Sequence, residues 1–235
     1  MSEVFSNVGA VVVAAGSSQR MGVDKAFLSL AGKPLLAWSV DVCQSCDLLD
    51  KIVIVLSEVN LASGRELMVE RGWSKVVGVC LGGERRQDSV ARGLEKLEDC
   101  DWVVVHDGAR PFLTQDLIRR GLVAASETGA AAAAVPVKNT IKLAGDDGLV
   151  RQTLHRRHLW AAQTPQVFRF AIIRRACRQI EDEATDDASM VESLGYKVRL
   201  YMGDYNNIKI TTPGDLALAE VIAHDGESNA SWNRL

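Results

Sequence analysis

Short apolar runs alternate with longer mixed stretches through the first half of this chain. The apolar runs have the length and the valine and isoleucine content of strands buried on both faces of a parallel sheet. The mixed stretches are long enough to form the helices that cover such a sheet. The predicted strands are the apolar run before Ala14 and the runs at 51–56, 76–80 and 102–106, and the predicted helices are 34–46, 60–71, 87–97 and 114–127. This order predicts an α/β fold with a doubly wound, mostly parallel sheet and right-handed crossovers.

The second half departs from this alternation after the small-residue run at 130–137. Between 138 and 160, two strand-like segments flank glycines and aspartates at 144–148, which predicts a β-hairpin that leaves the main sheet. Thr185 or Asp186 is the expected N-cap of a later helix. The remaining predictions are helices at 164–180, from 185 onward and at 213–223, strands at 197–202 and 207–211, and a loose polar tail at 224–235. No linker or repeat divides the chain, so a single domain over 1–235 is expected.

The composition and net charge of the chain limit the molecules that it is expected to bind and the compartment in which it is expected to work. The 235 residues carry a formal net charge of −3 without a basic block, so no nucleic acid partner is expected. No apolar run approaches ~20 residues, and the start lacks a signal segment, so we expect a cytoplasmic protein without a membrane span. The odd count of five cysteines agrees with a reducing compartment. Cys43 and Cys46 have C-x-x-C spacing, but on an apolar helix without a second ligand pair we expect them to be structural.

The segment from Ala14 to Lys25 directly follows the first predicted strand. Ala14, Ala15 and Gly16 are small enough to let backbone N–H groups approach a ligand closely. Arg20 and Lys25 add two cations at the carboxyl end of that strand, a combination suited to a triphosphate. The spacing matches neither a P-loop nor a dinucleotide-binding fingerprint. An ordinary turn with two solvated cations is the alternative interpretation.

Two further segments are expected at the same edge of the sheet. Gly82 and Gly83 precede a helix with Ser89 in its first turn, so their backbone can hold the edge of a flat ring, or simply form a capped turn. Asp107 ends a buried strand, where a carboxylate can bind Mg²⁺ between phosphate oxygens. Arg110 offers a planar cation to a phosphate or to Asp107 itself. A structural ion pair at the strand end is the alternative for these two residues.

The last candidates are isolated cations. Lys209 lies between two isoleucines in the segment 207–211, so it points away from their face, either toward phosphate or into solvent. The pair Arg156 and Arg157 after the hairpin can bind a second anion or remain solvated. The four histidines have no metal-binding spacing, and no Ser/His/Asp arrangement indicates covalent hydrolysis.

These segments belong to one ordered set of motifs. The pattern from Ala14 to Leu36 combines Ala-Ala-Gly, Arg-Met-Gly, Lys and Gly-Lys-Pro-Leu-Leu, and it resembles nucleotidyltransferases that make nucleotide-activated sugars and alcohols. The later motifs are Gly-Gly-Glu-Arg with Ser-Val at 82–90, Val-His-Asp-Gly-Ala-Arg-Pro at 105–111, Pro-Val-Lys-x-Thr-Ile-Lys at 136–142, Thr-Pro-Gln at 164–166, Thr-Asp-Asp-Ala-Ser at 185–189 and Asn-Ile-Lys-Ile-Thr at 207–211. With them, nearly the whole chain resembles the 2-C-methyl-D-erythritol 4-phosphate cytidylyltransferase family.

The resemblance implies a Mg²⁺-dependent transfer of CMP from CTP to methylerythritol phosphate, with release of pyrophosphate. It implies a nucleotide-diphospho-sugar transferase-like fold and a homodimer, in which the hairpin arm at 138–160 carries Thr140 and Arg156 into the partner's site. The residues that it implies for nucleotide binding are Ala14, Ala15, Gly16, Gly82, Gly83, Glu84 and Ser89. The implied catalytic residues are Arg20, Lys25, Lys209 and Arg156, the implied metal-binding residue is Asp107, and the polyol phosphate is assigned to Asp107, Arg110, Thr140, Arg156, Thr164 and Thr185.

The chain departs from the family pattern in three places. Asp24 stands beside the lysine where a proline is frequent, Glu84 stands where aspartate is common, and Gly108 replaces a frequent alanine. Ribitol 5-phosphate cytidylyltransferases share most of the motifs and differ in the polyol pocket. A guanylyltransferase acting on molybdopterin shares the first loop but does not account for 207–209. A non-catalytic nucleotide-binding protein is the alternative from another class, and it does not require the combined charges of Arg20, Lys25, Asp107 and Lys209.

Overall fold

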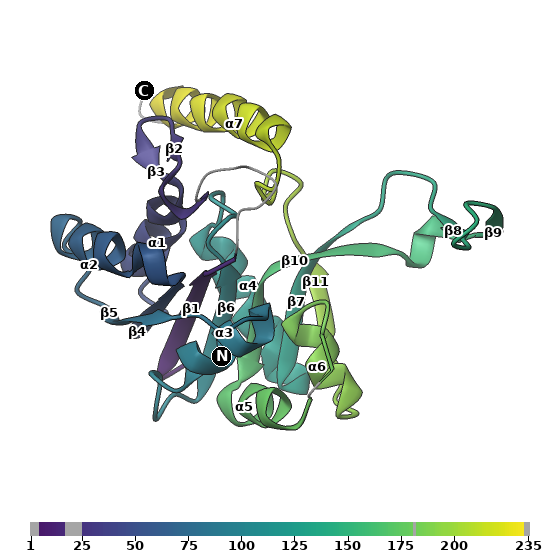
Figure 1. Ribbon diagram of the computed structural model, residues 1–235, viewed down its shortest axis with the longest axis horizontal. Helices are drawn as coiled ribbons and strands as arrows, with labels where there is room; N and C mark the ends of the chain where they lie inside the picture. Colours follow the sequence, from purple (N-terminus) through teal and green to yellow (C-terminus); the bar gives the residue numbers. More distant parts are fainter. Residues whose placement is uncertain (1–4, 17–24, 181, 233–235) are drawn as a thin grey trace.

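The computed structural model describes residues 5–16, 25–180 and 182–232, and within this part seven strands form one sheet (Figure 1). The strands of this sheet are β1 (Val8–Ala14), β4 (Lys51–Leu56), β5 (Val76–Leu81), β6 (Trp102–Asp107), β7 (Ala130–Pro136), β10 (Trp160–Arg169) and β11 (Arg199–Met202). The α-helices are α1 (Leu35–Ser45), α2 (Leu61–Glu70), α3 (Arg86–Leu94), α4 (Gln115–Thr128), α5 (Phe170–Gln179), α6 (Asp187–Ser193) and α7 (Pro213–Trp232). Shorter elements are β2 (Ser29–Leu30), β3 (Lys33–Pro34), β8 (Lys142–Ala144), β9 (Val150–Thr153) and single 3₁₀ turns at Lys25–Phe27, Glu58–Asn60 and Arg156–His158.

The sheet has the order β11-β7-β10-β6-β1-β4-β5. β5, β4, β1 and β6 are parallel neighbours, and β11 is parallel to β7. β10 alone among the described strands of this sheet runs antiparallel, and it joins β6 to β7. The doubly wound, mostly parallel α/β sheet predicted from the sequence is therefore confirmed.

Alternate side chains along the strands pack into two separate hydrophobic cores. Ala10 and Val12 of β1 face one core together with α1, α2 and α4. Val11 and Val13 face the other core together with α3, α5 and α6. Both faces of the central strand are thus buried, which explains its uninterrupted apolar run. Figure 1 shows the helices on the two sides of the sheet.

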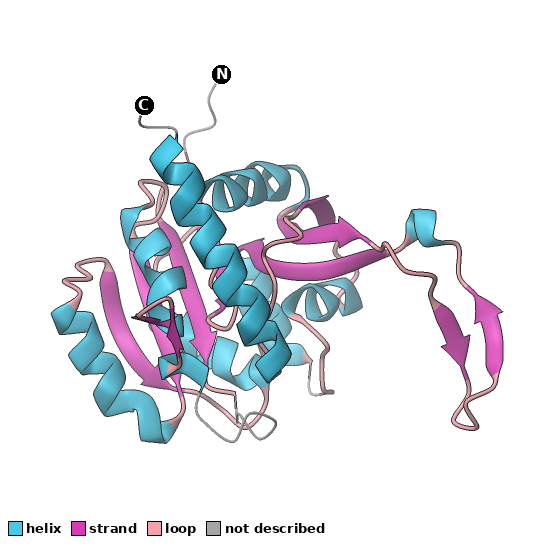
Figure 2. Cartoon of the chain, turned by 90° about the horizontal axis from the view of Figure 1, so that it is seen from above, coloured by secondary structure: helices cyan, strands magenta, loops and turns pink. Residues whose placement is uncertain are grey.

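The segment 138–160 carries two short strands that lie outside the seven-stranded sheet. β8 and β9 pair antiparallel, and every residue in these two strands is exposed. Figures 1 and 2 show this hairpin, which we call the arm, extending away from the rest of the chain. The arm begins where β7 ends and returns through β10, so the antiparallel strand forms its base.

Three sequence predictions in the second half were wrong. The helix expected from 164 starts only at Phe170, because 166–169 pair with β6 as part of β10. The segment 207–211 is not a strand: the N–H of Ile210 bonds the carbonyl of Ala109, and Ile210 packs under α7. The tail expected to be loose from 224 continues α7 as far as Trp232. The predicted cap at Asp186 is confirmed, since its side chain accepts the N–H of Ser189.

The C-x-x-C pair is structural, as expected. Cys43 and Cys46 are both buried in the core beneath α1, and the five cysteines are free thiols. Burial raises the pKa of Cys43 to about 12, so its unreactive thiol form is favoured. Among the described helices, none combines the length and the apolar character that crossing a bilayer requires.

A glycine sets the distance between α3 and the sheet. A Cβ at Gly93 would lie 2.5 Å from Cγ1 of Val11 and 3.0 Å from Cγ2 of Val55. We expect Gly93→Ala to lower the free energy of unfolding by about 1–3 kcal/mol, because overpacking displaces the helix or the strands. Urea unfolding measures this change.

The matched control is Gly214→Ala in α7. Its Cβ would lie 3.7 Å from Oγ1 of Thr212, the nearest atom, so the space is open. Alanine is the better helix former, and this variant should be as stable as the unmodified chain or more stable by about 0.5–1 kcal/mol. Equal losses in both variants would show that the close packing of Gly93 is not what matters.

Candidate functional site

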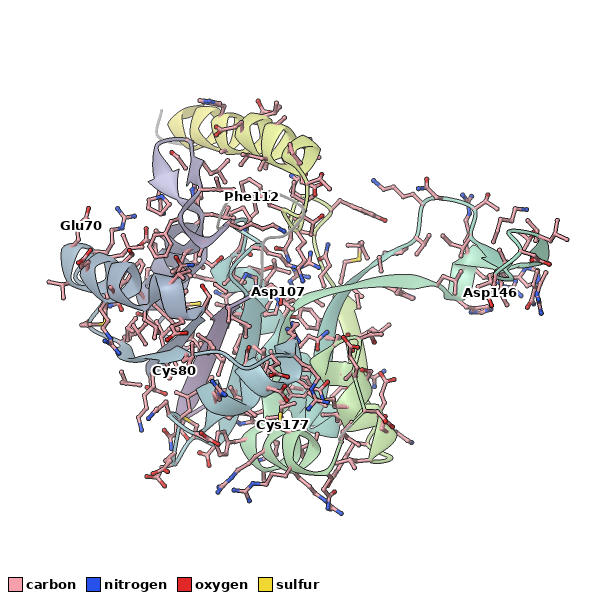
Figure 3. All side chains as sticks on the ribbon, in the orientation of Figure 1. Glu70, Cys80, Asp107, Phe112, Asp146 and Cys177 are labelled. Carbon is pink, nitrogen blue, oxygen red and sulfur yellow. The ribbon has the colours of Figure 1, made fainter. Side chains whose placement is uncertain are left out.

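The carboxyl ends of four parallel strands meet at one edge of the sheet. Ala14 of β1 pairs in register with Leu56 of β4, which pairs with Leu81 of β5, and Val13 pairs with Asp107 of β6. A cavity of about 430 Å³ opens at this edge, and we call it the strand-end cavity. It is lined by Val13, Ala14, Ala15, Gly16, Lys25, Ala26, Leu35, Gly83, Glu84, Arg85, Arg86, Ser89, Asp107, Gly108, Ala109, Lys209, Ile210 and Thr211. Figure 3 shows Asp107 at this end of the central strands.

Small residues let the walls of the cavity approach each other closely. A Cβ on Gly82 would collide with the side chain of Ala15 and lie 2.7 Å from Oγ of Ser89. The Ser89 hydroxyl accepts the N–H of Gly83 at 3.0 Å and donates to the carbonyl of Arg85. The loop after β5 is therefore held to α3 and lies against the loop after β1, and both loops form one narrow wall of the cavity.

Asp107 is the electrostatic centre of the site. Its Oδ1 accepts a hydrogen bond from Nε of Arg86 at 3.0 Å, and its Oδ2 lies 2.8 Å from Nζ of Lys209 and 3.7 Å from Nε of Arg110. The three cations come from α3, from the segment before α7 and from the turn after β6. Their convergence on one buried carboxylate makes this part of the cavity positive overall.

The protonation state of Asp107 follows from these partners. Burial alone would raise the pKa of the carboxyl, but Arg86, Lys209 and Arg110 outweigh burial and hold the pKa well below its ordinary value. Asp107 is thus ionised throughout the neutral range. Arg86 has a raised pKa because its two carboxylate partners outweigh the cost of burial.

A buried histidine and threonine hold the backbone at Asp107. The Thr164 hydroxyl accepts the N–H of Asp107 at 3.0 Å and donates to Nδ1 of His106 at 3.1 Å. The other ring nitrogen of His106 lies 3.0 Å from the carbonyl oxygen of Arg110, an acceptor, so Nε2 carries the proton. Burial lowers the pKa of His106 to about 4, and the ring is therefore neutral. His106 has a positioning role that the sequence did not indicate.

The segment 204–211 is tied to the same centre. The amide of Asn207 donates to the carbonyl of Thr164 at 2.7 Å, and Nη1 of Arg110 donates to the carbonyl of Asn207 at 2.7 Å. Asn207 is completely buried. These bonds hold the chain so that the next residue but one, Lys209, reaches Asp107 although the segment is not a strand.

The structure brings most of the candidate residues together but not all of them. Arg20 lies outside the described residues. Thr140 and Arg156 are exposed at the base of the arm, where Nη1 of Arg156 donates to the carbonyl of Lys138. Thr185 is exposed beside α6, outside the lining of the strand-end cavity. Thr164 is buried with both hydroxyl functions used, as described above.

Arg86 and Asp187 are two further residues of the site that carried no role in the sequence analysis. Arg86 bridges Asp107 and Asp187, with Nη1 donating to Oδ2 of Asp187 at 2.8 Å. Arg86 follows the glycine pair in the motif at 82–90, and Asp187 lies in the motif Thr-Asp-Asp-Ala-Ser at 185–189. The motifs include both residues, but the sequence does not show that their side chains turn inward to meet.

The side chains available as metal ligands limit how this site could bind a metal ion. Within 5–16, 25–180 and 182–232, no group of three or more His, Cys, Asp or Glu side chains is arranged to hold a metal ion. Asp107 supplies a single carboxylate, and its two oxygens already contact cations. Such a site fits a Mg²⁺ that shares ligands with bound phosphates better than a cation held by protein groups alone.

Comparison with known proteins gives one family. The sequence profile of the IspD family, 2-C-methyl-D-erythritol 4-phosphate cytidylyltransferase, matches residues 8–225. The enzyme of that name from Dehalococcoides mccartyi is 52% identical over 220 residues, which cover 93% of this chain and 97% of the relative. A crystal structure of 4-diphosphocytidyl-2C-methyl-D-erythritol synthase from Anaerococcus prevotii superimposes with a TM-score of 0.84 at 28% identity, covering 92% of this chain and 96% of that one. The 2-C-methyl-D-erythritol 4-phosphate cytidylyltransferase of Thermus thermophilus gives a TM-score of 0.75 at 34% identity over 91% and 98% of the two chains.

The neutral state of His106 predicts how stability changes with pH. Its pKa is about 4 in the folded chain and near the ordinary 6.5 when unfolded, so the unfolded chain binds more protons between these values. Stability from this residue is complete above pH 6.5 and falls as the pH drops toward 4, by up to about 3 kcal/mol. We expect His106→Gln to reduce the slope of unfolding free energy against pH between 6.5 and 4.5.

The control for this slope is His155→Gln, which removes an exposed histidine of the arm. It should keep the slope of the unmodified chain. If His106→Gln also keeps that slope, the buried neutral imidazole is not its source.

Proposed function

This chain belongs to the 2-C-methyl-D-erythritol 4-phosphate cytidylyltransferase family, and we propose that its strand-end cavity is the active site of that reaction. The protein is a nucleotidyltransferase of isoprenoid biosynthesis that transfers CMP from CTP to 2-C-methyl-D-erythritol 4-phosphate. The observation that carries the site assignment is the set of cations around Asp107 in the cavity at the strand ends. A reaction between two anions needs positive charge at that place.

We assign the nucleotide to the narrow wall of the cavity. The backbone of Ala14 to Gly16 and of Gly82 to Glu84 offers polar groups at a flat slot, and Ser89 braces the second loop. A pyrimidine ring fits such a slot because the glycines leave no side chain in the way. The triphosphate then extends toward Lys25 and Lys209, with Arg20 as a further cation of the first loop.

The proposed chemistry is a direct displacement at phosphorus. A phosphate oxygen of the acceptor attacks the α-phosphorus of CTP, a new P–O bond forms, and the bond to the bridging oxygen of the β-phosphate breaks. Pyrophosphate leaves with the electron pair, and no general base is required because the attacking phosphate is already ionised. Lys25, Lys209 and Arg20 stabilise the charge that develops at the α-phosphate.

Mg²⁺ is the proposed cofactor. Bound with the triphosphate, it supplies neutralisation of phosphate charge and polarises the α-phosphate. Asp107 is the residue assigned to position it, as one carboxylate beside substrate phosphates is a normal protein contribution to a Mg²⁺ site.

The acceptor is assigned to the positive side of the cavity. Asp107 is proposed to bind its hydroxyl groups, and Arg110 its charge. Thr164 and Thr185 remain candidates for the polyol on the resemblance alone. Thr140 and Arg156 complete the proposed site from the arm of a second copy.

The arm supports the proposal of a homodimer with shared sites. Its apolar side chains are uncovered: Leu143 is 51% exposed, Leu149 69%, Val150 58% and Trp160 40%. A two-stranded hairpin of this length is marginal alone in water, so a covering surface is needed. We propose one domain over 1–235 in which 138–160 serves as the dimer arm, and a reducing cytoplasm as its location, in agreement with the five free thiols.

The activity prediction uses release of pyrophosphate. With CTP and Mg²⁺, the unmodified chain should release pyrophosphate with 2-C-methyl-D-erythritol 4-phosphate and not with ribitol 5-phosphate. Lys209→Gln should lower kcat about 10²–10³-fold, because one fixed cation at the reacting phosphate is lost. Lys197→Gln, at an exposed lysine outside the arm and outside the cavity lining, is the control and should keep the activity. Release with ribitol 5-phosphate alone would overturn the acceptor, and full activity of Lys209→Gln would overturn its role.

The shared site predicts complementation. Lys25→Ala and Arg156→Ala should each be nearly inactive alone, since every site lacks one cation. After unfolding and refolding together in equal amounts, half of the dimers are mixed, and each mixed dimer has one intact site. The mixture should regain roughly a quarter of the unmodified activity. An inactive mixture that contains mixed dimers would show that the arm does not serve its partner's site.

A further inference from the structure

Arg86 joins two carboxylates through two different nitrogen atoms of its guanidinium group. Its Nε donates to Asp107 at 3.0 Å, and its Nη1 donates to Asp187 at 2.8 Å. Asp187 is the first residue of α6 and is completely buried. Arg86 is the first residue of α3, so the bridge connects two helices to the end of β6.

Asp187 makes few contacts beyond this bridge. In the part of the chain that the structure describes, its Oδ1 has no hydrogen-bond partner, and Arg86 is the cation in ion-pair contact with it. Burial raises the pKa of Asp187, and Arg86 is the group that opposes this rise. A buried carboxylate that lacks some of its hydrogen-bond partners lowers the stability of the fold. The presence of Asp187 at this position therefore needs an explanation other than packing.

The explanation lies in the distribution of cations around Asp107. Lys209 and Arg110 both approach Oδ2, whereas Arg86 alone among the described residues bonds Oδ1. Arg86 also lines the strand-end cavity, where a triphosphate is a stronger anion than one carboxylate. Without an anchor on its far side, Arg86 would turn toward the nucleotide and leave Oδ1 free.

We propose that Asp187 is a positioning residue, which holds Arg86 on Asp107 and thereby fixes the orientation of the Asp107 carboxylate when the nucleotide binds. The proposal rests on the proposed function, because Asp107 matters only if the cavity carries out the reaction. The guanidinium suits this role since its planar fork presents N–H groups in fixed directions to two carboxylates at once.

The decisive variant is Asp187→Asn, which keeps the shape and removes the charge. We expect kcat to fall about 10–100-fold, the range for loss of a group that orients an active-site residue, with the KM for CTP within about twofold of the original. The matched control is Asp186→Asn on the neighbouring residue. Asp186 caps α6 and bonds Gln166 but does not contact Arg86, so this variant should lower the melting temperature and keep kcat within about threefold.

A double-variant cycle separates positioning from structure. If Asp187 acts through Arg86 on Asp107, the Asp187→Asn change should have little further effect on kcat in an Asp107→Asn background. The same fold-loss in both backgrounds would overturn the proposal, as would equal losses of kcat in Asp187→Asn and Asp186→Asn. An unmodified chain without turnover would instead contradict the proposed function, and this inference with it.

Discussion

The buried carboxylate of Asp107 and the three cations around it constrain the whole site. A carboxylate removed from water is costly unless charge and hydrogen bonds replace its hydration. Here Arg86, Lys209 and Arg110 provide that replacement, and Thr164 holds the backbone beneath it. Each partner belongs to a different segment of the chain. The carboxylate at the end of β6 therefore fixes the positions of these segments of the strand-end cavity relative to one another.

The same arrangement explains how a chain of net charge −3 can bind a highly charged anion. Overall charge decides little here, because the local excess of cations over carboxylates acts at short range around a buried carboxylate. Two buried carboxylates, Asp107 and Asp187, keep the cations from repelling one another before substrate arrives. The positive charge is therefore held in place and becomes available where an incoming phosphate competes for it.

The sequence predicted the strands that end at the cavity, because strands buried on both faces leave long apolar runs such as Lys51–Leu56. It missed β10 because Gln163 and Gln166 are polar but buried. Gln163 bonds the carbonyl of Asp204, and Gln166 bonds Asp186 and the N–H of Ala188. Such tertiary hydrogen bonds satisfy buried amides without any local pattern.

Some residues of the site could be predicted from the sequence, and others could not. Asp107 and Lys25 could be selected because they follow strands at a predictable edge of the sheet. Of two adjacent arginines at the start of α3, Arg85 pairs with Asp88 near the surface, and Arg86 turns inward. Arg85 is the N-cap and Arg86 the first residue of the helix, and the sequence alone does not show which of the two meets the distant Asp187.

The positions of these pairs along the chain also bear on synthesis. Arg86 pairs with a residue 101 positions later in the chain, and Asp107 pairs with Lys209, which is synthesised later still. The ribosome therefore synthesises every described strand of the sheet before Lys209, so Asp107 gains this partner only after those strands have been made.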